Sequence, residues 1–460
     1  MQMKENDMCK GFKITFESFD LDNPEGTLKK SLIMEGKISK PTNCLDFSFT
    51  HEQQIELIQA TLDKVLAEKS SLINRDAEYC PKCSRKLMKL GNHKSTFSDV
   101  FTDHEIVIQR LRCSKCGYEP ATTVRTILGT TMSGQLAKLQ SELGAEHSFR
   151  DSEKIFDRFS TKLRKINNHN RIKLVTEAVG DTLQTVNHDE KEMIKVEEAE
   201  ELILNVDGGH VKSKDPDVRS FEVLTSVVYR PESLQANSKN TRNYLSSKSC
   251  AASTQNDDQS EIIEDTIIAA IKEGMSSKTH ITALCDGAQN CWNIAESLKP
   301  LCKGVTSILD WFHIAMKMQN ISLPTELKSK FLRIKWHLWR GNTEAAITRL
   351  NQLISKVKSI KSLEKLQKFL IYIQNNQDKI VNYRERQKKG LVFTSNLAES
   401  TVESLINQRC KGQQHMLWSR EGLNPILQLR AKINSEDWCR KWKTVILNYT
   451  DVTRSTCPTI

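Results

Sequence analysis

Residues 201–213 read ELILNVDGGHVKS, and residues 279–292 read THITALCDGAQNCW. Each stretch is a short apolar run that ends in Asp followed by Gly, a pattern typical of a buried strand leading into a turn. The two stretches therefore predict neighbouring strands that deliver Asp207 and Asp286 to one site. Metal-assisted phosphoryl transfer needs such paired carboxylates, because two divalent ions share oxygen ligands. Either Asp alone is equally typical of an ordinary strand-to-turn position.

A third stretch, LDWFHIAMK from Leu309, predicts a strand that runs into a helix. Asp310 and His313 are three positions apart, so at the start of a helix they face the same way. This pair is a secondary candidate for the same site. The ordinary alternative is that Asp310 caps the helix and His313 is half-buried.

A fourth stretch, residues 396–422, predicts a helix on which Glu399 and Glu403 share one face because they are four positions apart. Two like charges at this spacing destabilise a helix unless something compensates them, and a bound cation would do so. Either glutamate is therefore a candidate third metal ligand.

Two C-x2-C pairs, Cys80 with Cys83 and Cys113 with Cys116, are separated by residues 84–112. Two thiolates at this spacing reach one metal together, and two such pairs complete a tetrahedral four-cysteine site. The residues between the pairs look like strands, which suits a zinc ribbon with one structural Zn²⁺. A disulfide framework is a weak alternative, because the 13 cysteines are an odd number scattered through a chain that looks intracellular.

The composition favours a polyanionic partner. The chain of 460 residues carries a formal charge of +10, and residues 314–390 contain 17 Lys and Arg against 5 Asp and Glu, a difference of +12. This segment is helical in pattern, with Trp336 and Trp339 on expected inner faces, and its one-sided charge favours a DNA-facing surface over a merely solvated one. The sequence shows neither an apolar run long enough for a membrane span nor a secretory signal, so we expect a cytoplasmic protein.

The chain length suggests several domains. We expect an α/β multidomain protein with these parts: 1–75, of unclear fold; 76–122, a zinc ribbon; 123–195, a helical and DNA-binding region; 196–313, the first part of a sheet core; 314–392, a basic helical insertion; and 393–460, the Glu-bearing helix and C-terminal helices.

In order, Asp207-Gly, Asp286-Gly-Ala, Asp310-x-x-His313 and a Glu-Ser pair ahead of Trp418 resemble the ISKra-type bacterial insertion-sequence transposases, and more distantly the Mutator-like group. The resemblance covers roughly residues 200–432. It departs at 231–258, which is unusually polar and hard to align. The resemblance implies a DDE-type transposase with an RNase H-like core. That core is a five-stranded mixed sheet flanked by helices, with an all-helical insertion between the second Asp and the Glu.

The resemblance also implies roles for particular residues. Asp207, Asp286 and Glu399 would hold two Mg²⁺ or Mn²⁺ ions, with His313 as a further catalytic residue. Glu399 fits the family motif best by spacing, and Glu403, in the more literal Val-Glu-Ser triplet, is the reserve. The residues expected to bind DNA are Lys317, Arg409, Lys411 and Trp418.

The implied activity is cleavage of an element's ends and their joining to target DNA. The expected partners are double-stranded DNA and further copies of the chain, as a dimer or higher oligomer, in the bacterial nucleoid. Two alternatives stay open: a different RNase H-like nuclease, such as a resolvase or ribonuclease, and a non-catalytic zinc-ribbon DNA-binding protein or inactive transposase relic. The three intact carboxylates favour an active enzyme over a relic.

Overall fold

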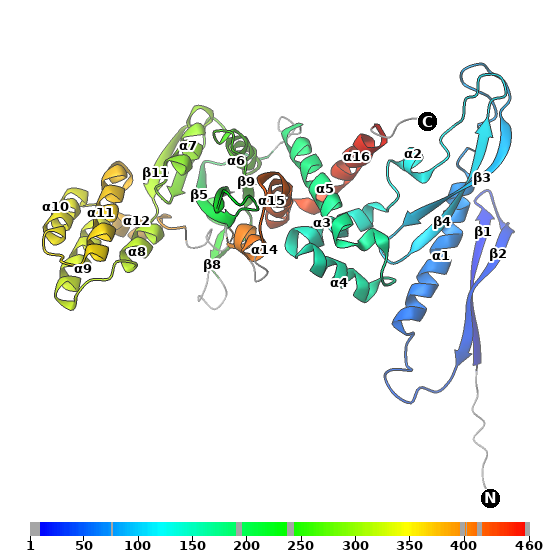
Figure 1. Cartoon of the computed structure of the whole chain (residues 1–460), viewed down its shortest axis with the longest axis horizontal. Coiled ribbons are helices and arrows are strands. Elements are labelled where there is room, and N and C mark those ends of the chain that lie inside the picture. The colour runs from blue at the N-terminus through cyan, green and yellow to red at the C-terminus, as the bar shows by residue number, and fades with distance from the viewer. Residues whose placement is uncertain are drawn as a thin grey trace, which may run out of the picture. The chain divides into compact units, whose positions relative to one another are not determined.

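The structure, a computed structural model, describes residues 10–74, 77–189, 196–236, 243–395, 401, 403–411 and 416–455. The chain divides into two compact units (Figure 1), Met1–Thr176 with Thr444–Ile460 and Glu177–Lys443. The division falls inside two helices, α5 (His169–Asp189) and α16 (Trp438–Ser455). Among the described residues, no helix combines the length and apolar character needed to cross a membrane.

The first unit is built from two antiparallel strand pairs and several helices. Its elements are β1 (Lys10–Asp20), β2 (Asn23–Ile38), α1 (His51–Ser71), β3 (Met88–Ser98), β4 (Asp103–Arg112), α2 (Val124–Leu128), α3 (Gly134–Glu146) and α4 (Phe149–Phe159). Inward-facing residues alternate with exposed ones along β4, as expected for a strand with one covered face. Ile106 and Ile108 from that face pack with Leu66 of α1 and Val124 of α2, which forms a small apolar core.

The second unit is an α/β structure around a five-stranded mixed sheet. Its strands are β5 (Glu201–Lys212), β6 (Ser220–Tyr229), β9 (Ser249–Ser253), β10 (His280–Cys285) and β11 (Gly304–Leu309), with a separate short hairpin of β7 (Leu234–Ala236) and β8 (Asn243–Leu245). The strand order in the sheet is β11-β10-β5-β6-β9. β10 runs parallel to β5 and β11, whereas β6 runs antiparallel to β5 and β9.

Helices cover this sheet, which explains why its central strands are continuous apolar runs rather than alternating patterns. The residues from Leu202 to Val206 in β5 are all buried. α6 (Ser260–Lys272) and α15 (Arg420–Asn434) pack against β9, and α7 (Gln289–Ser297) packs against β5, β10 and β11. α8 (Trp311–Gln319) follows β11 directly.

Between α8 and residue 392 the chain forms a helical segment, which Figure 1 shows in yellow. It comprises α9 (Thr325–Trp339), α10 (Thr343–Ile354), α11 (Ile360–Asn375) and α12 (Tyr383–Lys388). A π-helical turn (Glu403–Asn407) and α14 (Gln408–Cys410) then precede α15. The expectation of an α/β chain with a mixed sheet is thus confirmed.

The unusually polar stretch 231–258, which is hard to align with the transposases, contains β9, one of the two edge strands of the sheet. β9 has the sequence SCAAS and is buried throughout its length. Small residues give little strand signal by themselves. The strand is instead held by pairing with β6 and by Gln428 of α15, whose amide donates to the carbonyl of Ala252 at 3.1 Å.

Candidate functional site

Three aspartates lie in register where the parallel pairing of β5, β10 and β11 ends. Asp286 and Asp310 follow the last residues of β10 and β11, whereas Asp207 lies within β5, which continues to Lys212 in pairing with β6. The expectation that this strand ends at Asp207 in a Gly-Gly turn is therefore wrong, because both glycines are strand residues. In the strand pairing, Cys285 of β10 is opposite both Val206 of β5 and Leu309 of β11. Asp207, Asp286 and Asp310 are the next residues along the three strands. Because neighbouring strands lie about 4.8 Å apart, the three carboxylate-bearing residues form one acidic cluster.

The acidic cluster is held by hydrogen bonds that differ from one aspartate to the next. Gly208 N donates to the Asp207 carboxylate at 2.8 Å, and Ala288 N donates to that of Asp286, also at 2.8 Å. Asp310 N donates to the carbonyl of Cys285 at 3.0 Å, which ties the end of β11 to the end of β10. The backbone therefore fixes the cluster.

Asp310 is the most enclosed of the three aspartates, at 1% exposed. It is the N-cap of α8 and accepts a hydrogen bond from Phe312 N at 3.0 Å, a common way to satisfy the first turn of a helix. His313, one turn along, lies with its Nε2 3.6 Å from Asp310 Oδ2. The structure therefore brings both secondary candidates of the third stretch to the cluster, with Asp310 also acting as a cap.

The surroundings of the acidic cluster raise the pKa of the Asp207 carboxyl above its usual value. Burial raises the pKa of its carboxyl, and the charge of Asp286 and, more weakly, that of Asp310 raise it further, whereas His313 acts in the opposite direction. Like charges gathered in a half-buried place favour proton or cation binding. Hard carboxylate oxygens are the ligands that Mg²⁺ and Mn²⁺ prefer.

The helical segment is attached to the backbone of the cluster. The Tyr372 hydroxyl, from α11, donates to the carbonyl of Asp286 at 2.7 Å, and the Tyr383 hydroxyl donates to the carbonyl of Leu309 at 2.7 Å. Gly287 has a φ of +99°, and a Cβ at that residue would lie 2.6 Å from the Tyr372 ring. Gly therefore follows Asp286 for two reasons, its left-handed backbone and the closeness of the ring. No sequence signal indicated these two tyrosines.

Glu399 lies outside the described residues. The described residue nearest to it on the N-terminal side, Ser395, donates to the Asp310 carboxylate through both its backbone nitrogen and its hydroxyl. On the C-terminal side, Thr401 is buried and accepts a hydrogen bond from Lys248 at 3.0 Å. Glu403, the reserve candidate, is the first residue of the π-helical turn. The side chain of Glu403 is not among those that the structure describes. Such turns are frequent at functional sites.

Two of the four expected DNA-binding residues are exposed near the cluster. Lys317 has its Nζ 4.5 Å from the centre of the Tyr372 ring. Lys411 Nζ lies 3.7 Å from the point that a Cβ on Gly209 would occupy. Because side chains alternate along a strand, Gly209 shares its face of β5 with Asp207. Both ammonium groups therefore add positive charge beside the acidic cluster.

Arg409 and Trp418 are instead buried, at 2% and 8% exposed. The guanidinium of Arg409 lies 4.8 Å from the centre of the Trp418 ring, and burial lowers its pKa to about 10. Trp418 also pairs with the backbone at the end of β5, since its backbone N donates to Lys212 O at 3.0 Å and its carbonyl accepts from Lys214 N at 2.8 Å. In this structure the pair stabilises the edge of the core and faces no solvent.

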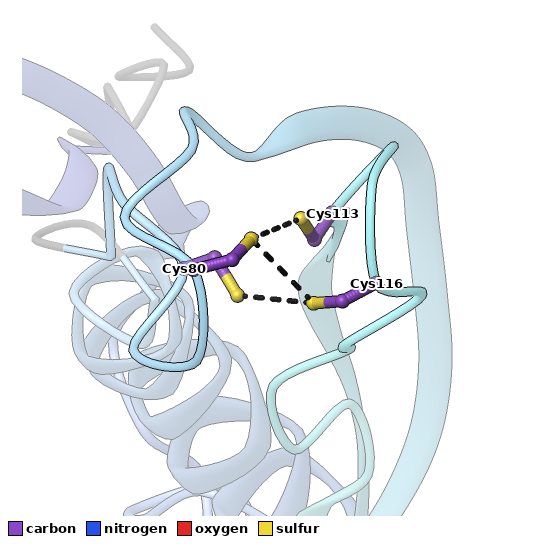
Figure 2. Close-up of side chains that lie close together, drawn as sticks. Cys80, Cys113 and Cys116 are labelled. Carbon is purple, nitrogen blue, oxygen red and sulfur yellow. Dashed lines mark hydrogen bonds between the residues drawn. The ribbon is translucent and has the colours of Figure 1, made fainter.

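The four cysteines of the two C-x2-C pairs converge in the first unit. Their ligand atoms all lie within 4.8 Å of one another, and Figure 2 shows Cys80, Cys113 and Cys116 pointing together. The Sγ–Sγ distances are 3.4 Å for Cys80 and Cys116, 3.3 Å for Cys83 and Cys113, and 3.7 Å for Cys83 and Cys116. Four sulfurs about 2.3 Å from a tetrahedral Zn²⁺ would lie roughly 3.8 Å apart. The cluster therefore could hold a zinc ion.

The two cysteine turns have the same backbone design. Ser84 N donates to Cys80 O at 2.8 Å, and Gly117 N donates to Cys113 O at 3.0 Å, with both donors at positive φ. Backbone N–H groups of Cys116 and Lys115 lower the pKa of the Cys113 thiol, to about 6. Thiolate is the form that binds metal. In the same turn the backbone N–H of Tyr118 lowers the pKa of the Cys116 thiol, but a hydrogen bond with Cys80 and burial outweigh it and raise that pKa, so only Cys113 is favoured as thiolate.

The comparison with family models gives one match, an uncharacterised protein family, UPF0236, over residues 133–444. The match covers 312 of the 460 residues, well over half of the chain. The chain belongs to the UPF0236 family. No curated protein matches it. In this UPF0236 chain the matched region contains Asp207, Asp286, Asp310 and the whole helical segment, and it begins after the cysteine cluster.

Proposed function

We propose that this UPF0236 protein is a DNA transposase of the DDE type, which cleaves the ends of an insertion sequence and joins them to target DNA. The observation that carries the proposal is the in-register alignment of Asp207 and Asp286 where the parallel pairing of β5 with β10 ends. Two carboxylates on adjacent strands in a partly buried place are an arrangement that metal-assisted phosphoryl transfer uses.

The order of elements supports the same proposal. A five-stranded mixed sheet carries both aspartates, and a purely helical segment separates Asp286 from Glu399, as the resemblance to the ISKra-type transposases implies. An RNase H-like core with a helical insertion accounts for this order. The family, although uncharacterised, is often associated with transposases in insertion sequences.

The donor set fits Mg²⁺ or Mn²⁺, because the cluster offers carboxylate oxygens whose mutual repulsion a cation would relieve. Asp207, Asp286 and Glu399 would hold the ions, with Glu403 as the alternative to Glu399. Two bound divalent ions would supply activation of the attacking oxygen and neutralisation of charge on the phosphate.

The chain's own residues would position the DNA strand at this cluster. In the cleavage step water attacks the phosphorus and the bond to the 3′ oxygen breaks, which frees a 3′ hydroxyl. In the joining step that hydroxyl attacks a phosphodiester of the target and displaces its 3′ oxygen. His313, held beside Asp310, would contact the scissile region, and Lys317 and Lys411 would bind phosphates on either side.

The zinc-binding part would be structural, because all four ligands come from the protein and none is left open for chemistry. Pairing two element ends requires at least two copies of the chain on DNA, so we propose a dimer or higher oligomer in the DNA complex.

The test is cleavage of a supercoiled plasmid that carries the gene with its natural flanking DNA on both sides. We expect the wild type to cleave at the flanks with Mg²⁺, and Asp207→Asn and Asp286→Asn to lose at least a hundredfold in rate. Asp217→Asn is the matched control, because Asp217 is an exposed aspartate in the loop after β5.

Equal cleavage by the wild type and Asp286→Asn would remove the enzymatic proposal. If the wild type binds the flanking DNA but never cuts it with Mg²⁺ or Mn²⁺, the chain is a non-catalytic DNA-binding protein or a transposase relic.

A further inference from the structure

One face of α9 in the helical segment carries basic and aromatic residues at intervals of three and four positions. The four are Arg333, Trp336, His337 and Arg340. Residues at this spacing lie side by side on a helix. Together with Trp339 and Arg384 they line a cavity of about 530 Å³. Ligand pockets typically measure roughly 300–1,000 Å³, so the cavity is large enough for a nucleotide.

The cavity is strongly positive. Arg333, Arg340 and Arg384 are all exposed, and no carboxylate in the described part of the chain lies within 4 Å of their guanidinium groups. Three arginines gathered without a counter-charge repel one another, and an anion relieves that repulsion. The guanidinium group also binds phosphate with two parallel hydrogen bonds.

The floor of the cavity is made of packed aromatic rings. Trp339 stacks on Tyr383 with ring centroids 5.9 Å apart and lies 4.7 Å from the ring of Trp311. Gly341, at φ +75°, brings the end of α9 against the backbone before α12, since a Cβ there would lie 3.0 Å from Asn382 N. The two helices that supply the arginines are therefore fixed to each other.

The same aromatic floor connects the cavity to the acidic cluster. Trp311 is the first residue of α8 and follows Asp310 directly, and Tyr383 donates its hydroxyl to the end of β11. Packed aromatic rings thus join the wall of the cavity at Trp339 to Trp311, the residue that follows Asp310.

Trp336 departs from its expected position on an inner face, because it is 55% exposed at the cavity. Burial and the nearby charges of Arg349 and Arg340 lower the pKa of His337, whose buried Nδ1 has no hydrogen-bond partner in the described structure. An exposed indole beside arginines is the combination with which proteins hold unpaired bases, since every base has a face that can stack.

We propose that this cavity binds an unpaired nucleotide of DNA, with its phosphates on Arg333, Arg340 and Arg384 and its base stacked on Trp336. The stacking surface requires an unpaired nucleotide, because both faces of a base are covered within a duplex. The inference rests on the proposed function, because it assigns to the transposase a site for the unpaired strand beside its acidic cluster.

The test is equilibrium binding of a fluorescent 12-nucleotide thymine strand, measured by anisotropy without added Mg²⁺ and without chelator, so that the cysteine cluster is left intact. The arginine variant is Arg333→Gln with Arg340→Gln and Arg384→Gln. The matched control removes three exposed lysines of the same segment that do not line the cavity, through Lys358→Gln, Lys361→Gln and Lys368→Gln.

We expect the arginine variant to bind at least tenfold more weakly than the control variant. Its salt dependence should also be shallower, by about two units in the slope of log K against log salt for three lost phosphate contacts. The proposal is overturned if the arginine variant binds within fivefold of the control.

Stacking has its own test with Trp336→Ala, whose side chain is exposed enough that its loss leaves the core intact. We expect roughly a fivefold to hundredfold loss on the thymine strand. We expect no loss on a strand of the same length made entirely of abasic sites. An equal loss on both strands would overturn the assignment of Trp336 to a base.

Failure of this proposal is distinguishable from failure of the proposed function. If the wild type cleaves DNA but the cavity variants bind normally, only the cavity proposal fails. If the cavity variants lose binding but the wild type never cleaves, the cavity stands and the transposase proposal fails.

Discussion

The hydroxyl of Ser395 donates to the buried carboxylate of Asp310 at 2.5 Å, and the backbone nitrogen of the same residue donates to the other oxygen at 3.1 Å. Ser395 comes at the end of the helical segment, whereas Asp310 comes before it begins. The two hydrogen bonds therefore return the chain to the acidic cluster after a long insertion. Glu399 follows only four residues later.

This relationship predicts the effect of Ser395→Ala. A buried carboxylate that loses a hydroxyl donor keeps its desolvation cost without the hydrogen bond, so we expect about 1–3 kcal/mol of lost stability. Urea denaturation measures it. Ser362→Ala is the control, because that hydroxyl bonds Ser322 O on the surface, and we expect a change within about 0.5 kcal/mol. Equal effects of the two substitutions would mean that the Asp310 contact contributes little.

A second prediction concerns Gly287→Ala, beside Asp286. Both the φ of +99° and the closeness of the Tyr372 ring oppose a Cβ. We expect about 1–2 kcal/mol from the left-handed backbone and a further 1–3 kcal/mol, roughly, from overpacking. Gly390→Ala separates the two terms, because Gly390 has a φ of +68° with nothing within 4 Å of the added atom. Denaturation midpoints that fall equally for both variants would contradict the packing argument.

The features that were predicted from sequence are those with strong local causes. An apolar run before Asp-Gly indicated the end of β10, because a buried strand must be apolar and its turn needs glycine. The same pattern at Asp207 does not end β5, which continues through two glycines to Lys212 because it pairs with β6. The cysteine cluster was predicted as a metal site because two C-x2-C pairs together supply the four thiolates of a tetrahedral zinc site. The structure confirms that its four sulfurs converge.

Other features depend on tertiary contacts that leave no local signal. The edge strand β9 consists of small residues and is defined by β6 and α15. Arg409 resembles a phosphate-binding residue in the sequence, yet its guanidinium is buried against Trp418. Trp336 has the spacing of an inner-face residue on α9, but it is 55% exposed and lines a cavity.

A third prediction concerns zinc. We expect the purified protein to contain about one Zn²⁺ per chain, and Cys113→Ser to lose most of it, because three ligands do not complete the tetrahedral site. Metal analysis by mass spectrometry measures the content. Cys44→Ser is the control, since Cys44 is exposed and outside the cluster. Unchanged zinc in Cys113→Ser would show that the ion is bound elsewhere.

A fourth prediction concerns pH and His104, which is buried between Asp63, at 2.6 Å, and Asp99, at 3.1 Å. Burial alone would lower the pKa of His104, but hydrogen bonds to the two carboxylates outweigh it and raise the pKa above 6.5. Burial likewise opposes ionisation of Asp99, yet its hydrogen bonds to His104 and to backbone N–H groups lower its pKa below 3.8.

The two shifts stabilise the fold over different ranges of pH. The raised pKa of His104 stabilises the fold below pH 6.5, and this contribution is lost as the pH rises through the raised value. The lowered pKa of Asp99 stabilises it above pH 3.8, and this contribution is lost as the pH falls. The pair therefore contributes most between these pH values, by at most about 2 kcal/mol. Urea denaturation at several pH values should show that His104→Gln removes the decline on the alkaline side. A decline that persists in His104→Gln would assign it to another group.

A fifth prediction decides which glutamate completes the proposed metal site. If Glu399 is the third ligand, Glu399→Gln should reduce Mg²⁺-dependent cleavage at least a hundredfold, as Asp207→Asn does, because a neutral amide neither balances the metal charge nor replaces a carboxylate ligand. Glu403→Gln should then retain most of the rate. Glu421→Gln, an exposed glutamate at the start of α15, is the control for loss of one negative charge. If instead only Glu403→Gln is inactive, the enzyme class stands and the third ligand comes from the π-helical turn. The carbonyls of Ser404 and Leu405 in that turn accept hydrogen bonds from Arg430. That turn would then present the ligand from a backbone fixed by a buried guanidinium, whereas Glu399 would present it from the segment that begins at Ser395. Full activity in both variants would contradict a third carboxylate from this part of the chain.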